Sequence, residues 1–479
     1  MKRLTLSKYT RTVERKEDIA VYHSLFGNLC IIDSDGYKIL QSFVVSQSCD
    51  DVLKKFPQYQ PSVLTRYIDQ LIAKRFLILK GFDENITIRE YYMQRRRNLH
   101  SGYLIRTLQL IMTNKCNYSC DYCFMKTIYS SDARFALQTN PQNITMSFDT
   151  AKAAIEKVLE IVRKNNNKEL YVEFFGGEPL LNWNVIKRIM DIFNNGYDVT
   201  IRYSITTNGA LITREMAETF NKYNATVTLS IDSFDFNGGL HSSHRKGSKQ
   251  VIRGLNTLKK YNNWVTVNSV LSNKTIDEFD GRALIEKAKS HNVDMIGLIL
   301  DLDLNSYKSA KYRRKALQQL WETYQWGEQK QIPVVGYWHQ ITQQIIGKQP
   351  TKYFSGYKTC PAAGCKLSVE PTGNVFICKC CSAPLGHIRD IENVLNSPQY
   401  ETYALKGFQN PKCRGCEVEG FCSGICMGAL EKKYNTITVI ENNACNIYKQ
   451  ITRKLIVNLN ADETNTLKLA QYKDVISKS

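Results

Sequence analysis

Long apolar runs are absent from this sequence. No stretch approaches the roughly 18 residues of a membrane-spanning helix, and "MIGLIL" at 295–300 is typical of the runs that occur. The first segment, "MKRLTLSKYTRTVERKEDIA", has no apolar signal-peptide core. Cysteine, at 15 of 479 residues, is too sparse for a disulfide scaffold. We therefore expect a cytoplasmic protein with reduced thiols and no membrane association.

Acidic residues are also in deficit. The chain has 45 Asp and Glu against 64 Lys and Arg, a formal charge of +19. Such a balance predicts attraction to acidic partners, either nucleic acid or an acidic peptide. The sequence has no helix-turn-helix arginine pattern or zinc finger, so we favour the peptide. At roughly 100 to 200 residues per domain, the length suggests about three domains.

The first 85 residues have the pattern of a small winged-helix-like module. "DIAVYHSLFGNLCIID" predicts a hairpin that turns near Gly27, and in "SQSCDDVLKKF" Ser48 and Asp51 form a variant capping box. A helix with one apolar face and a short strand are predicted to follow. The residues of that face are Val63, Leu64, Tyr67, Ile68, Leu71 and Ile72.

Residues 104–300 alternate between strand and helix patterns. The predicted strands are "TLQLIMT", "ELYVEFF", "VTIRYSIT", "ATVTLSID", "VTVNSVLS" and "DMIGLIL", and "TAKAAIEKVLEIV" is one of the helices between them. This order predicts an α/β fold with a parallel sheet, closed or half closed as a partial (β/α)6 barrel. In such sheets, sites lie where the strands end.

Three cysteines follow the first of these strands, in "TNKCNYSCDYCF". Cys116, Cys120 and Cys123 are too few for a structural zinc site, which takes four protein ligands. Three thiolates suit a four-iron cluster whose fourth iron is open to an exogenous ligand. The second strand ends in "FFGGEP", where paired glycines allow close backbone approach and a carboxylate follows.

Together these motifs resemble the radical S-adenosylmethionine (radical SAM) enzymes, whose cysteine signature has an aromatic residue, here Tyr122, before the last cysteine. The resemblance implies that S-adenosylmethionine binds the open iron and that the turn of Gly176, Gly177 and Glu178 holds its amino group. It also implies contacts from later strand ends and from an arginine that suits a carboxylate. The candidates are Ser204, Asn208 and Arg245, with Ser230 and Asp232 weaker. His241 and His244 have no assigned partner, and we interpret them as solvated loop residues.

The remaining cysteines gather after residue 360. "CRGCEVEGFCSGIC" has gaps of two, five and three residues and is preceded by "GNVFIC", a pattern similar to the SPASM extension of radical SAM enzymes. The resemblance implies two auxiliary four-iron clusters, and zinc ribbons are the alternative. One cluster would take Cys413, Cys416, Cys422 and Cys445, and the other Cys360, Cys378, Cys426 and, as its fourth ligand, Cys365. Without Cys365, that cluster would have an open iron able to bind the substrate. Cys380 and Cys381 are surplus, with packing or a free thiol as their expected role.

The N-terminal module resembles the leader-peptide recognition elements of ribosomal-peptide maturases, which bind a leader by strand addition. The expected plan is 1–85 recognition element, 86–103 linker, 104–310 partial barrel, 311–359 helical bridge, 360–450 cysteine-rich iron–sulfur domain and 451–479 tail.

By this resemblance, three [4Fe-4S] clusters and S-adenosylmethionine generate a 5′-deoxyadenosyl radical that abstracts hydrogen from a precursor peptide with an acidic leader. A thioether or carbon–carbon crosslink follows, and flavodoxin or ferredoxin supplies electrons. Epimerisation, with Cys380 or Cys381 as hydrogen donor, and formylglycine formation in a sulfatase are alternatives on the same scaffold. An iron–sulfur redox sensor that binds DNA is the alternative from another class.

Overall fold

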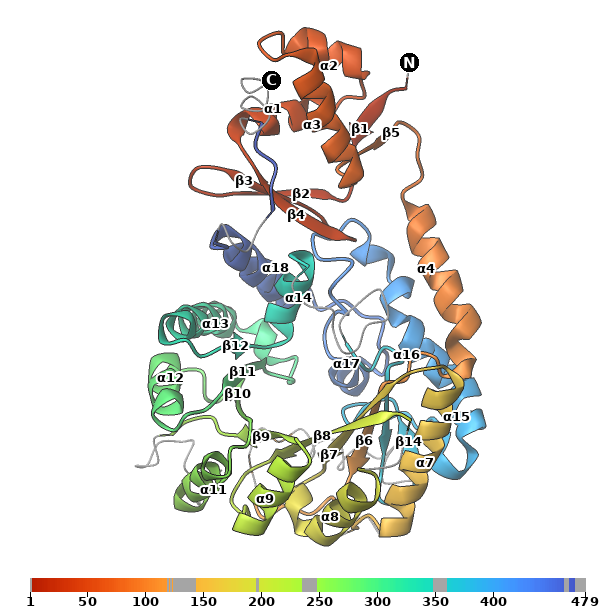
Figure 1. Ribbon diagram of the computed structural model, residues 1–479, viewed down its shortest axis with the longest axis vertical. Helices are drawn as coiled ribbons and strands as arrows, with labels where there is room; N and C mark the ends of the chain where they lie inside the picture. Colours follow the sequence, from red (N-terminus) through yellow and green to blue (C-terminus); the bar gives the residue numbers. More distant parts are fainter. Residues whose placement is uncertain are drawn as a thin grey trace.

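The fold was analysed in a computed structural model, shown in Figure 1. The structure describes residues 2–118, 120, 123, 144–194, 198–234, 248–347, 360–460 and 465–469. Tyr122, His241, His244 and Arg245 lie outside the described residues. Among the helices that are described, none combines the length and the apolar character that a membrane crossing requires.

The N-terminal module has the predicted order of hairpin and then helices. Its elements are β1 (Leu4–Leu6), β2 (Thr10–Glu14), β3 (Ile19–His23), β4 (Gly27–Ile32), α1 (Ser34–Ser42), α2 (Cys49–Lys55), α3 (Pro61–Ala73) and β5 (Leu77–Leu79). Strands β3 and β4 pair antiparallel, as predicted, and β2 extends the hairpin. The capping box at Ser48 and Asp51 is present. Five of the six apolar residues predicted on α3 are buried, whereas Ile72 is 38% exposed.

A helix connects this module to the rest of the chain. Helix α4 (Asn85–Asn98) is followed by a short turn, η1 (Leu99–Ser101). Although the segment was expected to be a linker, the side chain of Arg95 is buried, and its Nε donates to the Ala404 carbonyl over 2.9 Å. The connector is therefore anchored on the C-terminal region.

The six predicted strands form a parallel sheet in chain order. They are β6 (Thr107–Ile111), β7 (Glu169–Phe175), β8 (Thr200–Thr207), β9 (Thr226–Ser230), β10 (Val265–Leu271) and β11 (Met295–Leu300). Their crossover elements are α7 (Phe148–Lys164), η2 (Pro179–Asn182), α8 (Trp183–Ile192), α9 (Arg214–Lys222), α11 (Ser248–Lys260) and α12 (Gly281–Ser290). Figure 1 shows the strands as an arc with these helices on its outside, which confirms the predicted α/β class.

The apolar residues of the strands explain this arrangement. Alternate residues such as Leu108, Phe174 and Ile205 are buried toward the helices, where the apolar face of α7 meets them. Ile155 and Val158 belong to that face, because residues three and four apart share one side of a helix. The opposite face of the sheet lines the inside of the arc.

The sheet continues past the predicted strands at both ends. β12 (Val334–Val335) adds to β11, and β13 (Lys366–Val369) pairs parallel with β6. β14 (Asn374–Phe376) and β15 (Gly386–His387) follow β13 in antiparallel pairs. The cysteine-rich region is therefore continuous with the sheet that carries the first cysteine loop.

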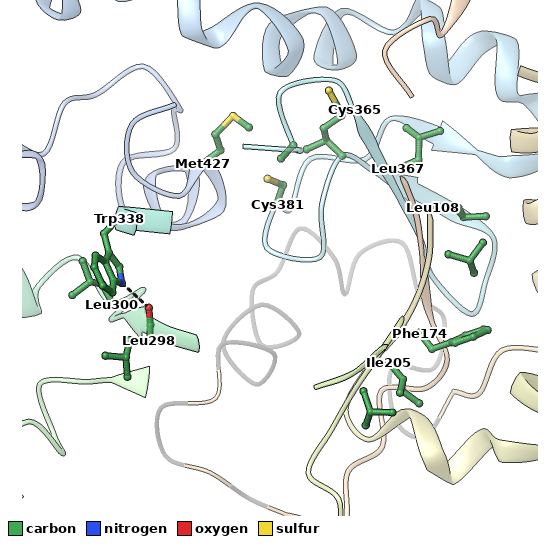
Figure 2. Close-up of a cluster of buried hydrophobic side chains, with 14 of the residues drawn as sticks. Leu108, Phe174, Ile205, Leu298, Leu300, Trp338, Cys365, Leu367, Cys381 and Met427 are labelled. Atoms are coloured by element: carbon green, nitrogen blue, oxygen red, sulfur yellow. Dashed lines mark hydrogen bonds between the residues drawn. The ribbon is translucent and has the colours of Figure 1, made fainter. Parts of the chain in front are cut away.

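Helices fill the remainder of the C-terminal half. They are η3 (Ser306–Lys308), α13 (Ala310–Lys330), α14 (Tyr337–Ile345), η4 (Ile388–Asp390), α15 (Ile391–Asn396), α16 (Pro398–Gln409), η5 (Pro411–Cys413), α17 (Met427–Tyr434) and α18 (Asn442–Val457), before a last strand β16 (Asn465–Thr466). One apolar core joins the sheet to these helices (Figure 2). The Trp338 indole N–H donates to the Leu298 carbonyl over 3.1 Å and fixes α14 on β11.

Candidate active site

The first cysteine loop leaves the end of β6. The thiols of Cys120 and Cys123 lie close enough to Cys116 for their charges to influence it, and burial raises the pKa of Cys116 to about 11. The Tyr118 backbone N–H donates to the Cys116 sulfur over 3.4 Å. A thiol with such a pKa is protonated at neutral pH, so it becomes a thiolate when a metal replaces its proton. The three predicted ligands are thus near one another.

The paired glycines hold this loop against the sheet. Gly177 N–H donates to the Thr113 carbonyl over 2.8 Å, and Glu178 N–H donates to the Lys115 carbonyl over 2.7 Å. A Cβ on Gly176 would lie 2.4 Å from the Thr113 oxygen, and one on Gly177 would lie 2.1 Å from the Lys115 oxygen. Glycine is needed here because the turn and the cysteine loop meet backbone to backbone.

The buried Glu178 side chain connects the ends of β7 and β8. Its carboxylate accepts hydrogen bonds from Thr207 Oγ1 at 2.6 Å, Asn208 N at 2.8 Å and Leu180 N at 3.1 Å. Burial raises its pKa to about 7, and the three hydrogen bonds oppose that rise. The carboxylate therefore ties the glycine turn to the end of β8. Sequence patterns do not predict that the Glu178 side chain points toward β8.

Asn208 and Ser204 occupy different positions along β8. Asn208 follows the strand, and its Nδ2 donates to Asn117 Oδ1 in the cysteine loop over 2.7 Å. Ser204 lies within the strand, in register with Glu173 of β7. Asn208 thus joins the cysteine loop directly, whereas Ser204 lies farther back in the sheet.

The two weaker candidates lie at the end of β9. Ser230 is its last residue, in register with Asn268 of β10. Asp232 is buried, and its Oδ1 accepts from the Val270 backbone N–H over 3.1 Å. Asp232 therefore joins the ends of β9 and β10.

Polar side chains cross the interior face of the sheet between the two cysteine regions. Glu173 Oε2 accepts from Gln109 Nε2 at 3.0 Å and from Lys366 Nζ at 2.5 Å. The Lys379 ammonium lies 3.0 Å from the centre of the Phe175 ring, which packs with Cys123. Lys379 and Phe175 thus lie between the first cysteine loop and the later cysteines. Sequence patterns missed this set because its members come from separate strands.

The later cysteines gather in two groups, which contain the ligands that the SPASM resemblance implied for each cluster except Cys365. The thiols of Cys413, Cys416 and Cys422 act on Cys445, whose pKa is raised to about 12 by burial and then by these neighbours. The thiols of Cys378 and Cys426 act on Cys360, whose pKa is likewise raised to about 12 by burial first. Each group therefore brings cysteines from distant parts of the sequence together.

Cys380 and Cys365 differ in their relation to the second of these groups. The Cys380 thiol hydrogen-bonds to both Cys378 and Cys426, and its bond lowers the pKa of Cys378 to about 5. Cys365 is buried at the start of β13, where its charge acts on Tyr103 and on other buried groups outside the cysteine cluster. Figure 2 shows the Cys365 sulfur pointing away from Cys381, the neighbour of Cys380.

These donor sets fit iron–sulfur clusters. In the described part of the chain, no three Cys, His, Asp or Glu side chains converge closely enough to hold a single metal ion. A four-iron cluster makes a different demand, because each thiolate binds a different iron atom. Three thiols at the first loop and two groups of thiols in the C-terminal region suit that demand.

A cavity of about 550 Å³ joins the cysteine regions. Cys123, Cys380 and Cys426 line it, together with Ser272 and Asp301 from the ends of β10 and β11. It therefore opens at the edge where the parallel strands end, as such sheets predict. Asp301 was missed by the sequence analysis, although its place directly after a strand was a usable signal.

Comparison with known proteins agrees with this site. Residues 110–283 match the radical SAM superfamily, and residues 360–417 match SPASM, described as an iron-sulfur cluster-binding domain. The radical SAM cyclopropyl synthase TigE of Paramaledivibacter caminithermalis is 39% identical over 455 residues, which cover 95% of this chain and 96% of that protein.

Two solved structures share the fold. Native anSMEcpe with bound AdoMet has a TM-score of 0.57 at 20% identity and covers 78% of this chain and 99% of its own. SuiB of Streptococcus suis has a TM-score of 0.51 at 14% identity, with 91% and 98% covered. Because the similarity to TigE extends over nearly the whole of both chains, this protein belongs to the radical SAM enzymes that carry a SPASM domain.

Proposed function

We propose that this enzyme closes a carbon–carbon bond within a ribosomally made precursor peptide, with a cyclopropane ring as the product. The observation that carries the proposal is the similarity to TigE, a cyclopropyl synthase by name, along 96% of its length. A cyclopropane is the tightest form of the carbon–carbon crosslink expected from the sequence. A thioether crosslink needs a substrate cysteine and is the alternative.

The cofactors would be held by the thiols described above. Cys116, Cys120 and Cys123 would bind the first cluster, and Gly176, Gly177, Asn208 and Arg245 are candidates for S-adenosylmethionine. When bound, these groups supply a hydrogen-abstracting radical and, in the SPASM region, an electron acceptor. Ring closure removes two hydrogen atoms from the peptide, so it needs both. The contribution of Glu178 would be to fix the turn, since its oxygens already accept three hydrogen bonds.

The cavity supports a substrate position between the cysteine regions. Cys123 and Cys426 line the same space, so a peptide side chain placed there would be near the first loop and one auxiliary group. Lys379 and Phe175 would bound that position from the sheet side. A bound peptide would cover this space and shield a reactive intermediate from water.

The fourth ligand of the first auxiliary cluster is, in this proposal, Cys380. Its thiol contacts those of Cys378 and Cys426 and lines the cavity with Cys426. Its backbone is also fixed, because Gly428 of α17 packs against the Cys380 carbonyl so closely that no Cβ would fit. Cys365 was the earlier candidate for this place. A cluster with four cysteine ligands would relay electrons without binding the substrate.

The remaining partners follow from charge and from the N-terminal module. We propose that residues 1–85 bind the leader of the precursor and that flavodoxin or ferredoxin supplies electrons. The net charge of +19 supports acidic partners for both roles.

Mass spectrometry of a precursor encoded beside the gene, after anaerobic reaction, tests the function. Loss of two hydrogen atoms with no loss of thiol alkylation supports ring closure. The same mass loss with one fewer alkylated cysteine identifies a thioether instead. Unchanged mass with deuterium uptake from heavy water identifies epimerisation, and an unmodified peptide beside active cofactor cleavage contradicts a role on that peptide.

A further inference from the structure

The far edge of the N-terminal sheet carries a strand from the other end of the chain. β16 pairs parallel with β4, with Asn465 in register with Cys30 and Thr466 in register with Ile31. The Leu467 backbone N–H then donates to the Ile31 carbonyl over 2.8 Å. Figure 1 shows this C-terminal segment beside the red hairpin of the module.

Two leucines of this segment are buried in the module. Leu467 is 4% exposed and Leu469 is 1% exposed, and both belong to the core of residues 1–85, with Val21 and Ile32. The two leucines are separated by one residue and both enter the same core, so the module offers two neighbouring apolar contact sites just after β16. Between them, Lys468 Nζ lies 3.7 Å from Asp18 Oδ2.

The paired segment is short for a structural strand. β16 has two residues, and both Asn465 and Thr466 are exposed. The segment pairs its main chain with the edge of β4 and buries Leu467 and Leu469, and a sheet edge binds an extended peptide through the same two kinds of contact. A ligand attached to its own protein has a high effective concentration, so even this weak contact would keep the edge filled.

We propose that the β4 edge is the leader-binding site and that residues 465–469 occupy it as a built-in surrogate which the leader displaces. The site accepts an extended peptide with two apolar side chains separated by one residue. This inference rests on the proposed function, since it assumes that the module serves peptide modification. The Asp18 carboxylate favours a basic or neutral residue between the two apolar ones, whatever the charge of the rest of the leader.

The test uses the full-length protein, a Leu467→Asp/Leu469→Asp double variant and a fluorescent peptide of sequence NTLKL. With its own segment released, the double variant is expected to bind the peptide at least tenfold more tightly than the wild type. An NTDKD peptide is the matched control and should not bind. Thr466→Ala, an exposed change in the same segment, should behave as wild type. Equal affinity for wild type and double variant, or no binding to either, overturns the proposal.

If the double variant folds poorly, a measurement on the wild-type protein tests the proposal instead. Excess NTLKL should speed hydrogen exchange at the Leu467 amide in the wild type. Unchanged exchange would show that the peptide does not displace residues 465–469 and would contradict the proposal. A precursor that is modified but never displaces the fluorescent peptide disproves this site and leaves the function intact. A precursor that displaces the fluorescent peptide but stays unmodified supports this binding site and contradicts the proposed function.

Discussion

The buried carboxylate of Glu178 accepts a hydrogen bond from the Thr207 hydroxyl over 2.6 Å. Because Glu178 follows β7 and Thr207 ends β8, this bond joins the glycine turn to the next strand. The same turn holds the first cysteine loop through Thr113 and Lys115. The position of the loop therefore depends on the Glu178 carboxylate.

The first prediction concerns the pH dependence of stability at Glu178. Its pKa of about 7 in the fold lies above the ordinary 4.5, so the folded state binds more protons than the unfolded one in that interval. Stability should then fall as pH rises. Relative to Glu178→Gln, the wild type is expected to lose about 2 kcal/mol of unfolding free energy between pH 5.5 and 8. Anaerobic urea titrations of both proteins measure this, and a constant difference across the range would contradict it.

The second prediction concerns the close approach at Gly177. The new methyl group of a Gly177→Ala variant would clash with the Lys115 carbonyl, so the turn would have to move away from the cysteine loop. A forced shift of this kind costs about 1–3 kcal/mol. We expect loss of iron from the first loop while the auxiliary clusters stay, measured by iron content and electron paramagnetic resonance. Gly81→Ala is the control for backbone strain away from the loop, since Gly81 has a φ of +84° but nothing lies within 4 Å of its new methyl, and it should keep the iron of the first loop.

The third prediction separates the first cluster from the others. Replacing Cys116, Cys120 and Cys123 together with alanine should abolish cleavage of S-adenosylmethionine. Iron content should fall from about twelve to about eight atoms per chain, because each four-iron cluster is independent in its ligands. Cleavage that survives the triple change would refute the assignment of the first loop. A wild-type content near four irons, with zinc present, would favour zinc ribbons in the C-terminal region.

Much of the sheet could be predicted because its strands are short apolar runs bounded by turns. β6 to β11 have this pattern, as does the apolar face of α7. β12 and β16 have two residues each, too few for any periodicity. Their positions depend on partners far along the chain, β11 and β4, which local patterns do not contain.

The site was predictable where ligands are close in sequence and less so where they are not. The SPASM resemblance grouped Cys413, Cys416, Cys422 and Cys445, and in the structure the first three thiols act on Cys445. The same resemblance named Cys365 as the fourth ligand of the other cluster and left Cys380 surplus, because spacing along the sequence does not show where a thiol points. Only the fold shows the neighbours of each thiol. Cys365 lies near Tyr400, whereas the Cys380 thiol hydrogen-bonds to Cys426.

The last prediction tests the ligand role of Cys380 in the protein that lacks the first cluster, where only auxiliary signals remain. Cys380→Ala there should change the electron paramagnetic resonance spectrum of one reduced auxiliary cluster and lower its iron retention, since one iron loses its thiolate. Cys365→Ala is the matched control and should leave that spectrum unchanged, because Cys365 lies close enough to Tyr103 and Tyr400 for its charge to act on them. The opposite pattern would restore Cys365 as the ligand. If neither change alters the spectrum, the cluster has an open iron, and Cys380 becomes a free thiol that lines the cavity as a hydrogen donor for epimerisation.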